Sequence, residues 1–460
     1  MRNREWVRQY GRMQEVRELV AIRLVVGEPI ISGKRCIVPM RQVFGGSESE
    51  LGMRLSELEK RLGRDAVTAF GLEEEAADVL EEVVVNGRGR SVPLRQALRE
   101  REVEFDFTFE WEAEDVELSN DFIIIHVGYE VGSMYRNIDI QFPIREKTLS
   151  ALKEITEAQI SATAIIPDSA CAAVVRDKWA MSFSGGMDST AMRVMCPELV
   201  ATTALFTDPG SVERVEQSVC EKLGTNFVIG TSREHIGRQT LGGAIVLGMM
   251  PFVEKEKIGL IATGKLHTDN VQYLLRIRDG KQVGRRQSSE LAFGVLQVDA
   301  MMGFTKFGVY DVLHRLDKGT YETLVPAYFN ADDPTIVSQT GRYLLDAATT
   351  GVGRNIDLSH EPKLSWHTNI YFGHYVLKKL GRGVLENYMT DIPQGIESQT
   401  EGMSLDFMLK YDQNMLVSLP ADFREYFEAK LKSAGVQLFS EADYSERQML
   451  LEMAFGPAQR

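Results

Sequence analysis

Residues 179–190 contain the side chains and glycines of this chain that are best suited to hold a phosphate. An apolar run ends at Ser184, two glycines follow, and a helix-compatible segment continues from Ser189. In such a turn the backbone N–H groups converge on an anion, and the helix N-terminus adds its unpaired donors and its dipole. Glycine allows the backbone angles and the close approach that a Cβ would block. The phosphate contacts are therefore expected from Ser184, Gly185, Gly186, Met187, Asp188, Ser189 and Thr190.

Asp188 adds a carboxylate to this turn, and we expect it to hold Mg²⁺ or to orient the phosphates. The segment lacks the Gly-Lys-Ser/Thr ending of the mononucleotide P-loop, so a different class of phosphate site is indicated. The alternative interpretation is an ordinary glycine turn that begins a core helix.

The elements that must position this turn alternate between strand-like and helix-like patterns. Strands are expected at residues 179–183, 199–206, 226–229 and 258–262, and helices at 188–195, 212–223 and 240–253. This alternation predicts a parallel sheet with helices on both faces, which binds ligands beyond the carboxyl ends of its strands. Three strand ends carry polar or glycine-bearing runs, at residues 184–189, 207–210 and 263–270. Their convergence predicts a nucleotide site.

The flanking regions predict two further domains. Alternating or continuous apolar residues predict strands at 103–111, 122–127 and 138–142, with His126 as a core histidine. Helical patterns occupy residues 4–20, 50–64 and 71–85, and a Met-rich helical pattern begins at 406. The expected fold class is α/β. A parallel, doubly wound, Rossmann-like sheet lies at 151–325, with an α+β domain and its antiparallel sheet at 1–150 and a mainly helical region at 326–460.

Composition limits the classes of partner. The 460 residues carry a net charge of −14, which argues against nucleic acid. The four cysteines are widely spaced, which predicts reduced thiols in a cytoplasmic protein and no zinc site. We find no targeting segment and no apolar run that could span a membrane, so no membrane partner is expected. His360, His367 and His374 recur at a spacing too wide to favour a metal site. A homo-oligomer is left open.

The run Ser184-Gly185-Gly186-Met187-Asp188-Ser189 resembles the Ser-Gly-Gly-x-Asp-Ser signature of the PP-loop, or N-type, ATP pyrophosphatases. Members of that superfamily cleave ATP between the α- and β-phosphates, usually to adenylate a carboxylate or carbonyl oxygen. The resemblance implies their sheet, which belongs to the HUP class, and ATP and Mg²⁺ as cofactors.

The order of motifs over residues 178–318 is most similar to the 7-cyano-7-deazaguanine synthase branch of these enzymes. Thr207 and Asp208 follow the second strand, Arg238 precedes a helix, and Asp269 lies five residues after Gly264. A Thr-Lys pair at Thr305 and Lys306 opens a later helix. The resemblance implies catalytic roles for Asp188, Asp269 and Lys306, ATP contacts from Thr207, Asp208, Gly264 and Lys265, and a substrate contact from Arg238.

This chain departs from that branch after Asp269. The branch has a Tyr-Pro-Asp-Cys run and a four-cysteine zinc site, and this sequence has neither. In their place a basic loop carries Arg276, Arg278, Lys281, Arg285 and Arg286. Arg276 and Arg278 are expected to clamp a carboxylate substrate or to cover the triphosphate, because arginine offers a planar bidentate fork. An exposed hairpin is the equal alternative.

Taken together, the sequence predicts an ATP-dependent ligase that adenylates a small carboxylate and passes the acyl group to a nitrogen nucleophile. The resemblance suggests a 7-deazaguanine carboxylic acid as substrate. It also suggests a protein acceptor, since divergent members of the branch in bacterial defence loci are thought to attach a deazapurine to a protein. The alternatives are an amide synthetase, a tRNA-modifying PP-loop enzyme and a non-catalytic ATP-binding sensor.

Overall fold

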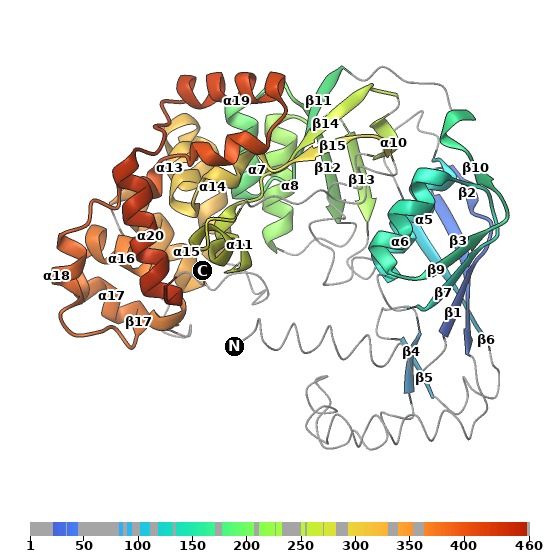
Figure 1. The fold of residues 1–460 in the computed structure, drawn as a ribbon, viewed down its shortest axis with the longest axis horizontal. Coiled ribbons are helices and arrows are strands. Elements are labelled where there is room, and N and C mark those ends of the chain that lie inside the picture. The colour runs from blue at the N-terminus through green and yellow to red at the C-terminus, as the bar shows by residue number, and fades with distance from the viewer. Residues whose placement is uncertain are drawn as a thin grey trace.

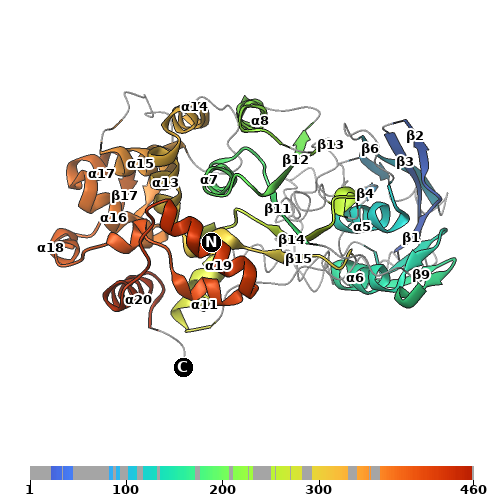
Figure 2. The same cartoon turned by 90° about the horizontal axis from the view of Figure 1, so that it is seen from above.

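The computed structural model forms three regions that lie side by side along its long axis (Figure 1). A sheet of N-terminal strands occupies one end, a parallel sheet the middle, and helices from the C-terminal part of the chain the other end, as the second view also shows (Figure 2). The structure describes residues 22–33, 35–44, 82–85, 90–93, 102–110, 118–131, 135–170, 177–206, 211–225, 227–231, 250–253, 255–269, 271–281, 293–329, 339–351, 353 and 363–457.

The N-terminal region is built on a mixed sheet. Its strands are β1 (Ile22–Val26), β2 (Ile30–Ser32), β3 (Arg35–Phe44), β6 (Glu102–Glu110), β7 (Asn137–Ile140) and β9 (Gln159–Ala162). β3 pairs antiparallel with β1, β2 and β6, whereas β1, β7 and β9 run parallel. The expected antiparallel sheet is therefore only partly correct. The sheet also continues past residue 150, the expected domain boundary, because β9 pairs with β7.

The alternating pattern at 103–111 predicts a strand, and β6 confirms it. The prediction of a strand at 122–127 is wrong, because these residues form α5 (Asn120–Val131). The side chains of Phe122, Ile123, Ile124 and Ile125 are all buried. A helix that is apolar on every side belongs in a core, and its short apolar run cannot be distinguished from a buried strand by periodicity. His126 is buried, as expected.

Three smaller elements surround this sheet. The helix α6 (Glu146–Thr156) packs against α5. Two two-stranded sheets pair β4 (Glu82–Val85) with β5 (Arg90–Pro93) and β8 (Ile144–Arg145) with β10 (Ile165–Ile166). The prediction of a helix at 71–85 is therefore wrong over its last four residues, which form β4. The helices expected at 4–20 and 50–64 lie outside the described residues, as do the predicted turn at 207–210 and most of the helix expected at 240–253.

The central sheet has five parallel strands. They are β11 (Lys178–Ser182), β12 (Val200–Phe206), β13 (Phe227–Thr231), β14 (Ile258–Ala262) and β15 (Leu296–Val298), in the spatial order β13-β12-β11-β14-β15. The helices α7 (Met187–Met195), α8 (Ser211–Leu223) and α10 (Met250–Val253) alternate with them. The predicted strands and the first two predicted helices of this region are thus confirmed, and so is the α/β class.

Both faces of the central sheet are covered. Successive residues of a strand point to opposite faces, and Ala180 and Met181 of β11 enter different buried clusters. Met181 packs in the cluster that contains α7 and α13 (Lys306–Leu316), and Ala180 in the cluster that contains α5 and β1. Burial on both faces explains why these strands read as apolar runs rather than as alternating patterns.

The remaining helices build the C-terminal region, which is mainly helical as expected. They are α11 (Val271–Arg278), α14 (Lys318–Phe329), α15 (Gln339–Thr350), α16 (Ile370–Leu380), α17 (Arg382–Tyr388), α18 (Ile396–Glu401), α19 (Ala421–Ser433) and α20 (Glu441–Phe455), with a minimal strand pair of β16 (Leu364–Ser365) and β17 (Met389–Thr390). The expected boundary at 325 falls inside α14. None of the helices in the described ranges combines the length and apolarity needed to cross a bilayer.

His374 in α16 gives a testable dependence of stability on pH. Thr400 donates its hydroxyl proton to the carbonyl oxygen of Ile396, so it accepts from Nδ1–H of His374 at 2.9 Å. Burial lowers the pKa of His374 from 6.5 to about 4. The unfolded chain therefore takes up the proton first, and stability should fall as the pH drops from 6.5 towards 4, by up to about 3 kcal/mol. Urea denaturation should show a smaller loss over this window for His374→Asn, which keeps a donor but cannot titrate. Equal losses in both proteins would contradict this origin.

Candidate functional site

The turn between β11 and α7 is shaped by two glycines. Gly185 has a φ of +79°, and a Cβ at this position would lie 2.1 Å from the carbonyl oxygen of Glu216 in α8. Gly186 is the N-cap of α7, and a Cβ there would lie 3.0 Å from Glu216 Oε1. Only glycine fits the first position without displacing α8. The turn therefore brings the N-terminus of α7 to the carboxyl end of the sheet, as the sequence predicts.

Hydroxyl groups hold the turn in this shape. The Oγ atoms of Ser184 and Ser189 are 3.0 Å apart, and Ser189 also donates to the carbonyl oxygen of Gly186 at 3.1 Å. Thr190 is buried, and its hydroxyl donates to the carbonyl oxygen of Gly185 at 3.0 Å. Thr190 therefore braces the turn from inside, whereas Ser184, Gly186, Met187, Asp188 and Ser189 line a cavity.

The end of β14 packs directly on the start of α7. A Cβ on Gly264 would lie 2.9 Å from the backbone nitrogen of Ser189 and 3.1 Å from the carbonyl carbon of Asp188. Thr263 beside it donates to Asp299 Oδ1 at 2.6 Å and ties the ends of β14 and β15 together. Two of the three strand ends predicted to converge are thus adjacent. The third, which contains Thr207 and Asp208, lies outside the described residues.

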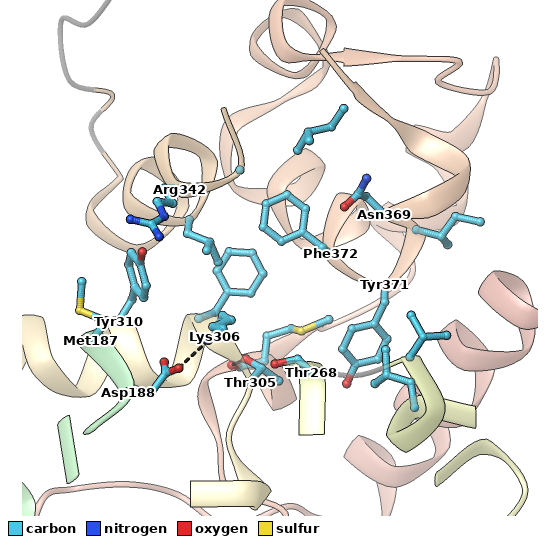
Figure 3. Close-up of a pocket in the computed structure, with 18 of the residues that line it drawn as sticks. Met187, Asp188, Thr268, Thr305, Lys306, Tyr310, Arg342, Asn369, Tyr371 and Phe372 are labelled. Atoms are coloured by element: carbon cyan, nitrogen blue, oxygen red, sulfur yellow. Dashed lines mark hydrogen bonds and ion pairs between the residues drawn. The ribbon is translucent and has the colours of Figure 1, made fainter. Parts of the chain in front are cut away.

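A second helix N-terminus meets the first at this place. Thr305 is the N-cap of α13 and Lys306 its first residue, as the Thr-Lys pair predicts. Lys306 Nζ donates to Asp188 Oδ2 at 2.5 Å (Figure 3). A lysine at a helix N-terminus opposes the helix dipole, and the carboxylate of Asp188 offsets that cost. The two residues expected to serve catalysis are therefore an ion pair between two helix N-termini.

These groups line a cavity of about 890 Å³ between the sheet end and the C-terminal helices. Figure 3 shows Asp188, Lys306, Tyr310 and Arg342 on one side of it, and Asn369, Tyr371 and Phe372 on the other. The first side is charged and lies at the two helix N-termini. The second side is mainly apolar and is formed by α16 and the residues just before it.

Tyr310 and Arg342 were not recognised in the sequence. Tyr310 lies one turn after Lys306 on α13, and Arg342 comes from α15. Burial raises the pKa of Tyr310 to about 12, so its hydroxyl stays protonated at neutral pH. A helical spacing of four from Lys306 could have indicated Tyr310. No local signal indicated Arg342, because only the packing of α15 brings it to the cavity.

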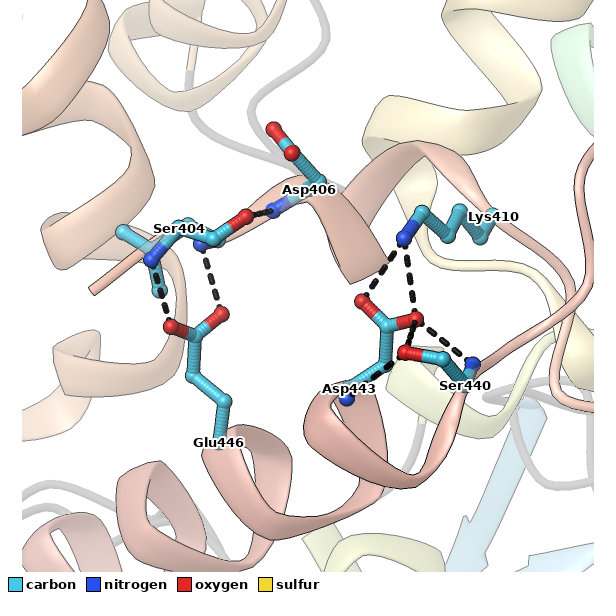
Figure 4. Close-up of polar contacts among 7 residues, drawn as sticks. Ser404, Asp406, Lys410, Ser440, Asp443 and Glu446 are labelled. Carbon is cyan, nitrogen blue, oxygen red and sulfur yellow. Dashed lines mark hydrogen bonds and ion pairs between the residues drawn. The ribbon is translucent and has the colours of Figure 1, made fainter.

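The C-terminal region fixes the N-cap that presents Lys306. Thr305 accepts from Gly308 N–H at 3.3 Å and donates to the carbonyl oxygen of Met408 at 2.6 Å. The segment around Met408 is held in turn by α20 (Figure 4). The carboxylate of Glu446 accepts the N–H groups of Ser404 and Leu405 at 2.5 and 2.6 Å.

Further contacts hold the same segment at its other end. Lys410 donates to both oxygens of Asp443 at 2.9 Å, and Arg447 pairs with the fully buried Asp412. Asp412 N–H donates to the carbonyl oxygen of Gly303, just before Thr305. A chain of contacts thus runs from α20 to the start of α13.

The two predicted arginines that the structure describes, Arg276 and Arg278, do not line the cavity. The expected basic loop begins at Arg276, but the chain is helical as far as Arg278, the last residue of α11, so that expectation is wrong over residues 276–278. Arg278 is buried, pairs with Asp279, and donates to the carbonyl oxygen of Phe455 at 2.8 Å, which ties α11 to α20. Arg276 is exposed. Arg238, Arg285 and Arg286 lie outside the described residues.

Two other predicted residues belong to the segment that follows β14. Lys265 follows Gly264, and its Nζ lies 5.6 Å from the centre of the Tyr273 ring. Asp269 ends a short 3₁₀ helix, η5 (His267–Asp269), whose Thr268 does line the cavity. The side chain of Asp269 lies outside the described set.

The potential metal ligands of the sequence do not gather. His367 is exposed at the cavity and His374 is buried in α16, while His360 lies outside the described residues. Over the ranges given above, no group of three His, Cys, Asp or Glu side chains is placed to hold a metal ion. Cys36, Cys196 and Cys220 are buried and carry thiols rather than disulfides.

The chain matches no protein-family model, and neither a curated protein nor a solved structure shows significant similarity to it. The geometry of the site therefore carries the functional argument.

Gly264→Ala tests the close contact between β14 and α7. The added Cβ meets backbone atoms, which cannot rotate away, so we expect a loss of about 1–3 kcal/mol in unfolding free energy. The shifted α7 should also bind inorganic pyrophosphate more weakly in calorimetry. The control is Gly383→Ala, because Gly383 is an exposed helical residue with open space at its Cβ. That change should be neutral or stabilising, and equal effects of both changes would argue against a specific contact.

Thr305→Val tests whether the N-cap presents Lys306. The change keeps the side-chain shape but removes both hydrogen bonds, so it should cost about 1 kcal/mol of stability and weaken pyrophosphate binding. Thr305→Ser retains the hydroxyl and should restore the affinity measured by calorimetry. If the valine and serine variants bound pyrophosphate equally, the hydroxyl would have no part in positioning the lysine.

Proposed function

We propose that this chain is an ATP-dependent ligase that cleaves ATP to AMP and pyrophosphate, adenylates a carboxylate, and transfers the acyl group to a nitrogen nucleophile. The observation that carries the proposal is the meeting of two helix N-termini, α7 and α13, at the Ser-Gly-Gly-x-Asp-Ser turn, with the Lys306–Asp188 pair between them. This arrangement places several anion-binding groups around one cavity.

The order of the central strands supports the same proposal. The chain runs outward from β11 to β13 and then returns to place β14 and β15 on the other side of β11. In doubly wound, Rossmann-like sheets, the ligand site lies at the carboxyl ends of the strands where the order reverses. Here that position is between β11 and β14, where Gly264 packs on α7. We assign the sheet to the PP-loop type on these grounds.

The residues present fit ATP and Mg²⁺. The glycine turn offers backbone N–H groups and the space that a Cβ would fill, and Asp188 offers a carboxylate at the cavity. Asp188 would hold Mg²⁺, which supplies neutralisation of phosphate charge when it is bound. The triphosphate would lie against the α7 N-terminus, with Lys306 and Arg342 at its charged oxygens. Asp208 or its neighbouring backbone would approach the adenosine.

The chemistry that follows is mainly positioning and charge stabilisation. A carboxylate oxygen of the substrate attacks the α-phosphorus, and the bond from that phosphorus to the oxygen bridging to the β-phosphate breaks. Pyrophosphate leaves, and the α7 N-terminus and Lys306 stabilise the charge that develops on it. The nitrogen nucleophile then attacks the acyl carbon, loses a proton, and displaces AMP. Asp269 is the proposed residue at the reacting end.

The substrate proposed is a small carboxylate, and a 7-deazaguanine carboxylic acid is the example that the resemblance to 7-cyano-7-deazaguanine synthases supplies. A protein is the proposed acceptor. A homo-oligomer is compatible with this scheme.

Lys306→Met tests the proposal in two steps. The change keeps the length of the side chain and removes its charge, so ATP binding measured by calorimetry with Mg²⁺ should weaken. With a panel of carboxylic acids, the formation of AMP and pyrophosphate should fall by about 100-fold or more. Lys318→Met is the matched control, because Lys318 is exposed at the first position of α14 and does not line the cavity.

Three outcomes would count against the proposal. Formation of ADP and orthophosphate would show cleavage at the wrong bond. Equal activity of the Lys306→Met and Lys318→Met variants would remove the role of the lysine. Tight ATP binding without AMP from any acid would favour the ATP-binding sensor instead.

A further inference from the structure

The cavity continues beyond the phosphate end into an apolar compartment that the C-terminal helices build. Its walls include Phe372 of α16, Leu274 of α11 and Phe455 of α20. The bond from Arg278 to the carbonyl oxygen of Phe455 ties α11 to α20. Two of the three helices that supply these walls are therefore bonded to each other.

Two hydroxyl groups in this compartment are buried without a hydrogen-bond partner among the described residues, namely Tyr371 Oη and Thr268 Oγ1. Tyr371 is 8% exposed, and Figure 3 shows it on the side of the cavity away from Asp188 and Arg342, with Thr268 between Tyr371 and Thr305. Leaving a buried hydroxyl unsatisfied costs free energy, which a ligand that bonds to it would recover. These two groups therefore indicate where a polar atom of a ligand belongs.

The aromatic side chains indicate the shape of that ligand. Phe307 and Phe372 stack with their ring centres 5.2 Å apart and their planes 20° apart. Phe307 is buried, whereas Phe372 is half-buried and lines the cavity. A planar ring can extend the stack on the open side of Phe372.

The positions of the charged lining residues indicate that the ligand body carries no charge. The described lining residues that carry a carboxylate or a permanent cation are Asp188, Glu216, Lys306 and Arg342. Glu216 lies beside the Gly185–Gly186 turn, and Figure 3 shows the other three on the phosphate side. The amide of Asn369 donates to the carbonyl oxygen of Ser365 at 2.9 Å, and His367 is exposed. Among the side chains that the structure describes, the compartment therefore offers no ionic partner to a charged ligand body.

We infer that this compartment binds the body of the carboxylic acid substrate, and that this body is an uncharged planar ring with one neutral polar group that bonds to Tyr371 and Thr268. The inference rests on the proposed function for the orientation of the acid, whose carboxylate points to the phosphate side. Binding of the ring and its polar group depends only on the compartment, and not on cleavage of ATP.

The test compares two acids of nearly equal shape by calorimetry, with and without α,β-methylene-ATP. Indole-3-carboxylate carries a ring N–H, and benzothiophene-3-carboxylate has sulfur in its place. We expect the native chain to bind the indole acid roughly 3- to 10-fold more tightly, the effect of one hydrogen bond. Tyr371→Phe and Thr268→Val should each reduce this preference, and the double variant should abolish it.

The control is Thr148→Val, which removes another buried hydroxyl without a described partner, in α6 and outside the cavity lining. It should leave the preference unchanged. Tyr371→Phe should also keep the native thermal midpoint, because its hydroxyl has no partner in the described structure to lose. A lower midpoint together with an unchanged preference would assign Tyr371 a structural role only.

Failure of this inference is distinguishable from failure of the proposed function. Binding of the indole acid that weakens in the variants, without AMP from any acid, would leave the compartment assigned and overturn the ligase proposal. Three results would overturn the compartment assignment, whether or not AMP is formed. They are no binding of the indole acid with or without α,β-methylene-ATP, an undiminished preference in the double variant, and binding of succinate as tight as that of the indole acid.

Discussion

The meeting of two helix N-termini is the constraint on which the rest of the site depends. α7 and α13 pack against each other, and each brings the N–H groups of its first turn and the positive end of its dipole to the same cavity. Lys306 adds a full positive charge, and Asp188 is the carboxylate paired with it. Such a place favours an anion with several oxygens. The glycines at 185 and 264 are needed because α8 leaves no room for a Cβ at the first position and α7 leaves none at the second.

The C-terminal helices supply the part of the site that the central sheet does not form. Thr305 caps α13 and also bonds to Met408, whose segment is held by Glu446 and Asp443 of α20. The same region supplies Tyr371 and Phe372 to the cavity wall. The position of the lysine and the shape of the apolar compartment therefore depend on the same set of helices, so changes in α20 are expected to affect both.

Local patterns predicted the central sheet well and the N-terminal region less well. The strand-turn-helix around Ser184 and the strand at 258–262 could be read because short apolar runs ended at glycine or polar turns. The apolar run in α5 has the sequence pattern of a buried strand, because a helix buried on every side has no hydrophobic periodicity. The mixed pairing of β1 with β3 and β7 depends on long-range contacts and has no local signature.

The sequence by itself determined the glycine turn at Gly185-Gly186, the N-cap pair Thr305-Lys306 and the α/β class, because each depends on neighbouring residues and on backbone chemistry. The tertiary structure decided which distant side chains share the cavity. It brought Tyr310, Arg342 and Tyr371 to the site and turned Arg278 towards the end of α20. The physical reason is that the packing of helices remote in sequence sets these distances. The residues around a charged or hydroxyl side chain do not specify the surface against which its helix will pack.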